Sequence, residues 1–163
     1  MEGAVTGRIG RRMKRVTVVF MVSALSTCVA AIGDGFVLTP GAAEVVVSAT
    51  AAKQDPAAQF AAEEMANFLS RVFGASVGLV HAPTPGKVSV IVGSNEWSRA
   101  AGIDVAMLPR DAYAVKVTGD RVFVVGRDSP EFSAFEKEWG EERGTVHGVY
   151  GFLERFAGCR VYF

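Results

Sequence analysis

A long amphipathic segment closed by glycine is the feature that most limits what this chain can fold into. Its apolar side chains recur with helical spacing at Ala61, Met65, Phe68, Leu69 and Val72. Asp55 is the expected N-cap, Pro56 fits the first helical position and Gly74 suits a left-handed C-cap. The spacing therefore predicts a helix that begins at Pro56 and ends at Phe73.

Two further helices are expected. The segment Thr145–Ala157 is followed by Gly158, and its apolar stripe consists of Val146, Val149, Tyr150 and Leu153. A shorter helix begins after Val92-Gly93, with Ser94 as its expected N-cap, and ends at Gly102. β-branched runs lie between these helices, so the order of helices and strands indicates the fold class.

The β-branched runs predict strands that alternate with these helices. They are Glu44–Ala51, Ser76–Ala82, Lys87–Gly93, Ala112–Thr118, Arg121–Gly126 and Cys159–Phe163. Gly119-Asp120 forms a two-residue hairpin loop, and the arm after it is apolar on both faces, as expected for a central strand. This order predicts an α/β (α+β) fold, a two-layer sandwich in which two main helices pack on one face of a mixed sheet.

The first 31 residues have the pattern of a secretory signal peptide. Of the 17 basic residues, five lie in this part, at Arg8, Arg11, Arg12, Lys14 and Arg15. An uncharged stretch, Val16–Gly33, follows directly and ends in small residues, so cleavage is expected after Ala30 or Ala31. Residues 32–43, rich in Gly and Pro, are then a linker, and the folded domain covers residues 44–163. The protein is expected to be exported to the periplasm or the cell exterior.

Other interpretations of this N-terminal part stay open. Residues 16–33 are 18 uncharged residues, which reach the lower end of the length of a membrane anchor. Cys28 lies where a lipoprotein signal would have its lipidated cysteine, although Thr27 before it fits poorly. Met13 is an alternative start. After cleavage, no membrane partner is expected.

Charge and cysteine content exclude several classes of protein. Acidic and basic residues both number 17, and after residue 30 the chain holds 12 basic and 16 acidic residues, a net charge of −4. A nucleic-acid partner is not expected, because such proteins carry a basic excess. Cleavage would leave Cys159 as the sole cysteine, so the domain would fold without an internal disulfide, and a buried, inert thiol is expected there.

Residues typical of metal or nucleophilic chemistry are sparse. His81 and His147 lie in different elements, and without metal-ligand spacing they are expected to be surface or capping histidines. Ser94 resembles a nucleophile elbow only superficially. Gly144 and Gly148 open a helix, but close packing of helix on sheet explains them better than a phosphate loop. No metal, cofactor or catalytic residue is predicted.

Carboxylates and tryptophans leave weaker candidates. The pairs Glu63-Glu64, Glu136/Glu138 and Glu141-Glu142 could supply acid–base chemistry by residue type only, and they are expected to be solvated. Trp97 and Trp139 are the candidate carbohydrate-binding residues, because indole rings stack on sugar faces. Packing in the core or at a hinge is the competing interpretation.

Three stretches resemble a known family. They are residues 66–75 (ANFLSRVFGA), 90–97 (VIVGSNEW) with 102–104 (GID) and 108–111 (LPRD), and 124–128 (VVGRD) with 143–160 (RGTVHGVYGFLERFAGCR). Together they resemble the N-terminal, non-catalytic domain of family 67 α-glucuronidases and of related secreted bacterial proteins. A similar domain precedes the barrel of β-N-acetylhexosaminidases. The RGT-x-x-G-V-Y-x-F-L-E run is the most specific part, and the resemblance covers about residues 44–163.

The resemblance implies an α/β sandwich that is not itself the catalyst. The family's catalytic carboxylates lie in a following (β/α)8 barrel, which needs about 250 residues, so no catalytic residue is transferred to this chain. The family continues past the last strand, and the chain ends within it at Phe163, as expected of a truncated product.

These observations predict an accessory domain of an exported, polysaccharide-degrading protein related to xylan breakdown. Its expected partner is a polysaccharide or a separate catalytic domain. The alternative is a free-standing module that binds carbohydrate through Trp97 or Trp139, or that binds another protein.

Overall fold

The structure is a computed structural model that describes residues 30–32, 36–133 and 141–159. The predicted signal segment lies almost entirely outside these residues. So do Trp139, the Glu136/Glu138 pair and most of the strand predicted at Cys159–Phe163. No helix in the described ranges has the length and apolar character that crossing a membrane requires.

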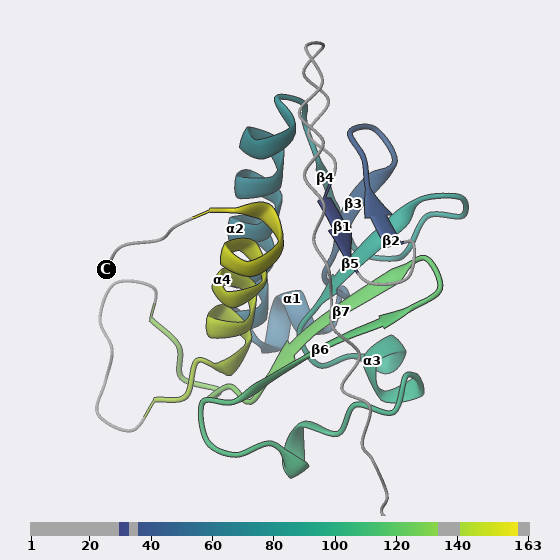
Figure 1. The fold of residues 1–163 in the computed structure, drawn as a ribbon. Helices are drawn as coiled ribbons and strands as arrows, with labels where there is room; N and C mark the ends of the chain where they lie inside the picture. Colours follow the sequence, from purple (N-terminus) through teal and green to yellow (C-terminus); the bar gives the residue numbers. More distant parts are fainter. Residues whose placement is uncertain (1–29, 33–35, 134–140, 160–163) are drawn as a thin grey trace, which may run out of the picture.

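A five-stranded mixed sheet forms the centre of the domain (Figure 1). Its order is β4 (Gly78–Val80), β3 (Ala43–Val46), β5 (Val88–Val92), β7 (Arg121–Gly126) and β6 (Tyr113–Thr118). The first four strands are parallel, and β6 runs antiparallel to β7. The hairpin and the interior position of its second arm are confirmed, and β7 is buried along Val122–Gly126.

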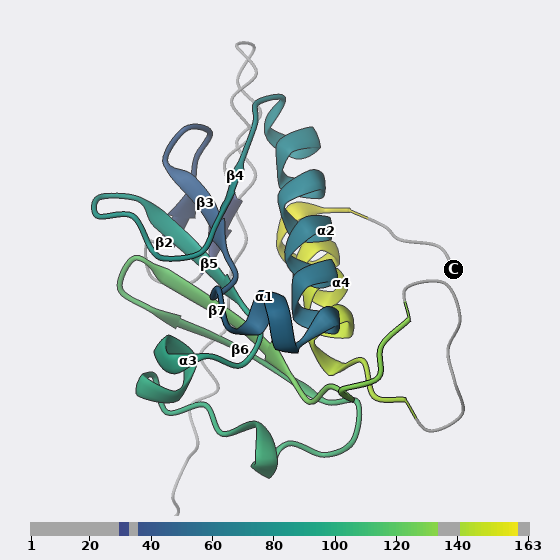
Figure 2. The same ribbon diagram turned by 180° about the vertical axis from the view of Figure 1, so that it is seen from behind.

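Two long helices lie side by side on one face of the sheet, as Figures 1 and 2 show from opposite sides. They are α2 (Pro56–Phe73) and α4 (Gly144–Ala157), and a short helix, α1 (Ala51–Gln54), precedes α2. The predicted fold class is therefore confirmed. The main core lies between these helices and the sheet and includes Val45, Val90, Val124, Met65 and Phe152, each at most 1% exposed.

The opposite face of the sheet has a smaller apolar cluster. Val46, Ile91, Phe123 and Val125 point to this side and are buried with Ile103. The chain from α3 (Glu96–Ala100) through a 3-10 turn, η1 (Val105–Met107), passes here and covers the cluster. The sheet is thus buried on both faces near the ends of its central strands, as is typical of parallel strands.

The ends of α2 agree with the sequence prediction. The Asp55 side chain accepts a hydrogen bond from Ala58 N at 2.9 Å, Pro56 begins the helix and Gly74 adopts a left-handed conformation with φ of 62°. Gly158 closes α4 in the same way, with φ of 67°. Local sequence signals are therefore sufficient for these three helix ends.

Three details differ from the prediction. The first strand ends at Val46, and Ala51 already belongs to α1, whose first turn is bonded by Ser48. The N-cap of α3 is Asn95 and not Ser94: Asn95 is extended, its side chain accepts from Ser98 N, and Ser98 Oγ accepts from Asn95 N. This reciprocal capping box satisfies two backbone donors, which Ser94 in its position cannot do.

The third difference lies in the segment interpreted as a linker. A short antiparallel ribbon pairs β1 (Ala30–Ile32) with β2 (Phe36–Leu38), and Leu38 is fully buried in the main core. Part of the Gly- and Pro-rich stretch therefore packs against the domain instead of only connecting it.

Candidate functional site

Of the two predicted carbohydrate-binding residues, Trp97 alone lies among the described residues. Trp97 is half-buried and packs against the small cluster on the far face of the sheet, while Trp139 lies outside the described residues. His81 and His147 are exposed on different elements, as expected, and His81 Nδ1 lies 3.1 Å from Val47 O. Among the described residues no group of three or more potential metal ligands occurs.

Glycines let α4 approach the sheet very closely, which confirms the packing interpretation of the Gly144–Gly148 stretch. A Cβ atom on Gly126, at the end of β7, would lie 2.0 Å from Gly144 C and Thr145 N. A Cβ on Gly144 would lie 2.4 Å from Ala112 O. Both obstructions are backbone atoms that cannot rotate away, so these two positions require glycine.

A polar cluster holds the first turn of α4 at this contact, and we name it the α4 clasp (Asp111, Gly126, Asp128, Arg143 and Thr145). Thr145 Oγ1 donates to Asp128 and accepts from Gly126 N at 2.9 Å. Thr145 N donates to the second Asp128 oxygen at 2.8 Å, and Arg143 N donates to Asp111 Oδ1 at 2.8 Å. Two carboxylates from other segments thus satisfy backbone donors at the start of α4, which a helix end otherwise leaves unpaired.

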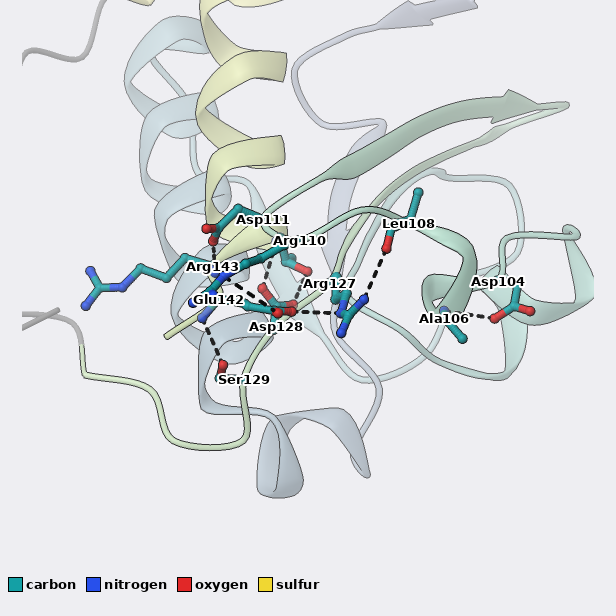
Figure 3. A network of polar contacts seen from close by, with 11 residues as sticks. Asp104, Ala106, Leu108, Arg110, Asp111, Arg127, Asp128, Ser129, Glu142 and Arg143 are labelled. Carbon is teal, nitrogen blue, oxygen red and sulfur yellow. Dashed lines mark hydrogen bonds and ion pairs between the residues drawn. The ribbon is translucent and has the colours of Figure 1, made fainter. Parts of the chain in front are cut away.

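Arg110 and Arg127 pair with Glu142 beside Asp128 and Arg143 of the clasp (Figure 3). Arg127 Nε lies 2.8 Å from Glu142, and Arg110 Nε lies 3.9 Å from the other oxygen of the same carboxylate. Arg143 pairs with Glu141 at 3.0 Å and also donates to Ser133 O at 2.8 Å.

The prediction that Glu141-Glu142 is a solvated pair is therefore wrong. Glu141 is 6% exposed and the Glu142 side chain 16%. Burial is tolerated because arginines supply opposite charge to each carboxylate, and Arg143 also donates a hydrogen bond to Glu141. Glu64, from another predicted pair, is likewise engaged, since its carboxylate accepts from Tyr150 Oη at 2.9 Å.

Asp128 has unusual electrostatics. Burial raises its pKa to about 6, and the nearby carboxylates Asp55 and Asp111 act in the same direction, whereas the hydrogen bonds from Thr145 oppose the shift. Burial also raises the pKa of Asp55, against the opposing hydrogen bonds from Ala58 and Ala57. An acid with a pKa near 6 could in principle transfer protons at neutral pH.

The contacts of Asp128 indicate a structural role for this acid. Both of its oxygens are bonded to Thr145, one to the amide and one to the hydroxyl. A catalytic acid has to present an oxygen to a substrate, and doing so here would break the first turn of α4. The clasp is therefore suited to fastening a helix to a sheet, and its geometry does not suit bond cleavage.

An apolar pocket lies further along α4, against the edge strand β6. Its volume is about 370 Å³, and it is lined by Tyr113, Val115, Val117, Gly151, Phe152, Arg155 and Phe156. Six of these seven residues are apolar or aromatic, and the guanidinium of Arg155 supplies the positive charge. Such a lining is typical of a surface that binds apolar groups together with a negative charge.

Comparison with known proteins does not assign the chain to a family: no family model matches it, and no curated protein matches it significantly. The clasp was not among the candidate sites predicted from the sequence. Its signal was present in the stretches VVGRD and RGT, where a glycine after a strand, an Asp two residues later and a Thr at a helix start occur together.

Proposed function

We propose that the chain is a non-catalytic accessory domain of an exported carbohydrate-active protein of the α-glucuronidase type. The proposal rests on the resemblance of residues 44–163, in which the run Arg143–Gly158 is the most specific part. In this interpretation the domain supports a separate catalytic barrel that acts on plant polysaccharide such as xylan.

One structural observation supports the non-catalytic part: the polar groups at the start of the resemblance motif, those of Arg143 and Thr145, are used inside the domain. Thr145 forms hydrogen bonds with Asp128 and Gly126. Arg143 forms hydrogen bonds with Asp111, Glu141 and Ser133. The motif's glycines lie so close to atoms of neighbouring segments that a side chain would not fit. A motif whose side chains make such contacts serves to build the fold.

Hydrolysis assays test the non-catalytic part directly. The purified chain is incubated with an aryl α-glucuronide and with glucuronoxylan, and released product is compared with a heat-denatured blank. We expect no release above the blank. Turnover that persists on repurification and is lost in Asp128→Asn would overturn this part of the proposal.

The accessory role has a separate test in the genome. The DNA downstream of the coding sequence is expected to contain a frame, fused, shifted or separate, that encodes a (β/α)8 barrel with a glycosidase's paired carboxylates. Downstream DNA with no such frame, in this organism and its relatives, would contradict the accessory role and leave the hydrolysis result unaffected.

A carbohydrate-binding module is the second candidate, and the partial exposure of Trp97 favours it. Xylo-oligosaccharides and chitin oligosaccharides would be titrated while the intrinsic fluorescence is followed. Binding that disappears in Trp97→Phe or Trp139→Ala would support this function. An unchanged fluorescence spectrum at saturating sugar would exclude it.

A further inference from the structure

Among the described residues, the edge of β6 that faces away from β7 has no strand partner, and it lies beside the apolar pocket. In the described ranges β6 pairs only with β7, and Thr118 faces Arg121 across the two-residue loop. In an antiparallel ladder, hydrogen-bonded residue pairs alternate with non-hydrogen-bonded pairs. The Thr118–Arg121 pair that closes the loop is hydrogen-bonded, so Lys116 and Ala114 also bond to β7. The bond from Arg127 N to Ala112 O, at 3.0 Å, fits this series. The backbone N–H and C=O groups of Val115 and Val117 therefore point to the open edge.

The same two valines also line the pocket with their side chains. Tyr113, Val115 and Val117 lie on the helix side of β6, and Tyr113 fills the hollow at Gly148 and Gly151. Val117 is 37% exposed beside this groove. Backbone groups for pairing and an apolar groove for alternate side chains thus occur together, which is what addition of a strand requires.

The charge at the groove selects among possible occupants. Arg155 lies over the Phe156 ring, with its guanidinium carbon 5.6 Å from the ring centroid, and none of the described carboxylates forms an ion pair with it. A second copy of β6 would bring Lys116 and no acid. The segments that precede β1 and follow α4, residues 3–29 and 160–163, contain basic residues and likewise no acid. A strand from a different polypeptide with an acidic residue fits better.

We propose that the edge of β6 and the groove between β6 and α4 bind an extended segment of another polypeptide. This segment places two apolar side chains and one carboxylate on the same face, at alternate positions. It adds to the sheet as a strand beside β6, its apolar residues contact Val115, Val117 and Phe152, and its carboxylate pairs with Arg155. The proposal stands independently of any carbohydrate function.

The probe is a labelled, end-blocked peptide, Thr-Val-Thr-Val-Thr-Glu-Thr, and its partner peptide carries Lys in place of Glu. Fluorescence anisotropy with the full chain is expected to show saturable binding of the acidic peptide. Binding of the basic peptide should be about tenfold weaker or more, as for a juxtaposed like charge. Equal affinities, or no saturation by either peptide, would overturn the proposal.

Two matched pairs of variants locate the binding. Arg155→Glu should reverse the preference for the two peptides, whereas Arg99→Glu, an exposed residue on α3, should leave it unchanged. Val117→Lys should abolish binding, whereas Thr118→Lys, whose side chain lies on the other face of β6, should retain it. Circular dichroism verifies that each variant is folded, and an unchanged preference in Arg155→Glu would contradict the assigned site.

The remaining outcomes identify other occupants. A dimer in sedimentation experiments that Val117→Lys dissociates would mean that a second copy occupies the groove. Peptide binding that appears only after deletion of residues 1–29 or 160–163 would mean that the chain's own segment does so. Either result would overturn the proposal of a separate polypeptide.

Discussion

The two long helices start in different ways, and the difference separates what is local in this fold from what is not. At the start of α2, the Asp55 side chain accepts a hydrogen bond from Ala58 N, three residues later. Pro56 occupies the first helical position, where its missing N–H leaves no hydrogen bond unmade. At the start of α4, Arg143 makes no side-chain cap, and Asp128 caps from 17 residues away. Asp111 adds a contact across 32 residues. The first helix is thus capped by its own sequence, and the second by the tertiary structure around it.

The close contact under α4 should give the largest effect of any change at either helix start. Gly126→Ala places a Cβ against the backbone of Gly144 and Thr145, which can move only if α4 shifts off the sheet. We expect a loss of about 3 kcal/mol in the free energy of unfolding, measured by urea denaturation. Gly78→Ala in β4, where a Cβ meets no atom within 4 Å, is the matched control and should change little. Equal losses in the two variants would refute the close-packing account.

Removing each carboxylate cap compares the two helix starts directly. Asp55→Ala should cost about 1 kcal/mol of unfolding free energy, as ordinary N-caps do. Asp128→Ala should cost about 2 kcal/mol, because the Thr145 amide and hydroxyl both lose a buried partner. Chemical denaturation near pH 5 gives both values. A larger loss for Asp55→Ala would reverse the ranking that the structure implies.

Asp128 should make the free energy of unfolding fall as the pH rises, which is the opposite of the effect of a carboxyl whose pKa is lowered by folding. A carboxyl whose pKa is raised from 3.8 to about 6 binds its proton more tightly when folded, so its contribution to stability is complete below the unfolded pKa. That contribution is lost as the pH rises through about 6. Between pH 5 and 7.5 the free energy of unfolding should fall by about 1.4 kcal/mol from this group alone.

The control for this pH effect is Asp128→Asn, which cannot titrate and should show a flatter profile over the same range. Titration of the buried Glu44 should not change the stability between pH 5 and 7.5. Burial tends to raise its pKa, but hydrogen bonds from Thr84 and Ser89 and the charge of Lys87 lower it overall. Its contribution is present above the unfolded value of 4.5 and lost only below it. A wild-type profile as flat as that of the variant would show that Asp128 is not buried as described.

The smallest effect is expected further along α4. A Cβ on Gly151 would lie 2.5 Å from the Tyr113 hydroxyl oxygen, which is the far end of a side chain that can rotate. Alanine also favours the helix by about 1 kcal/mol over glycine. Gly151→Ala should therefore change the thermal midpoint by only a few degrees. A loss as large as that of Gly126→Ala would mean that Tyr113 is fixed.

The features that could be predicted from the sequence are those that depend on local contacts, as at the start of α2. The bounds of α2, the left-handed Gly74 and Gly158 and the β6–β7 hairpin were predictable, because each depends on residues within one turn or loop. The glycines at the start of α4 indicated close packing, but their partner Gly126 did not emerge from local patterns. Asn95 was missed as an N-cap because Ser94 and Asn95 are both good capping residues, and only the backbone conformation separates them.

The site was harder to predict than the fold. Asp128 and Thr145 acquire meaning only when β7 and α4 lie side by side, and Glu141 is buried only because Arg143 accompanies it. The pocket beside β6 likewise requires knowing that α4 presents Gly151 and Arg155 to an edge strand. Residue type and spacing carry no information about such long-range neighbours.

The most direct test of the structural role of the resemblance motif is a double-mutant cycle between Asp128 and Thr145. The free energy of unfolding is measured for wild type, Asp128→Ala, Thr145→Val and the double variant near pH 5. Thr145→Val removes the hydroxyl that donates to Asp128 and keeps the backbone N–H, so the cycle isolates the hydroxyl–carboxylate bond. The sum of the two single losses should exceed the double loss by a coupling of about 1–3 kcal/mol. Strictly additive losses would contradict the claim that this pair fastens α4 to the sheet.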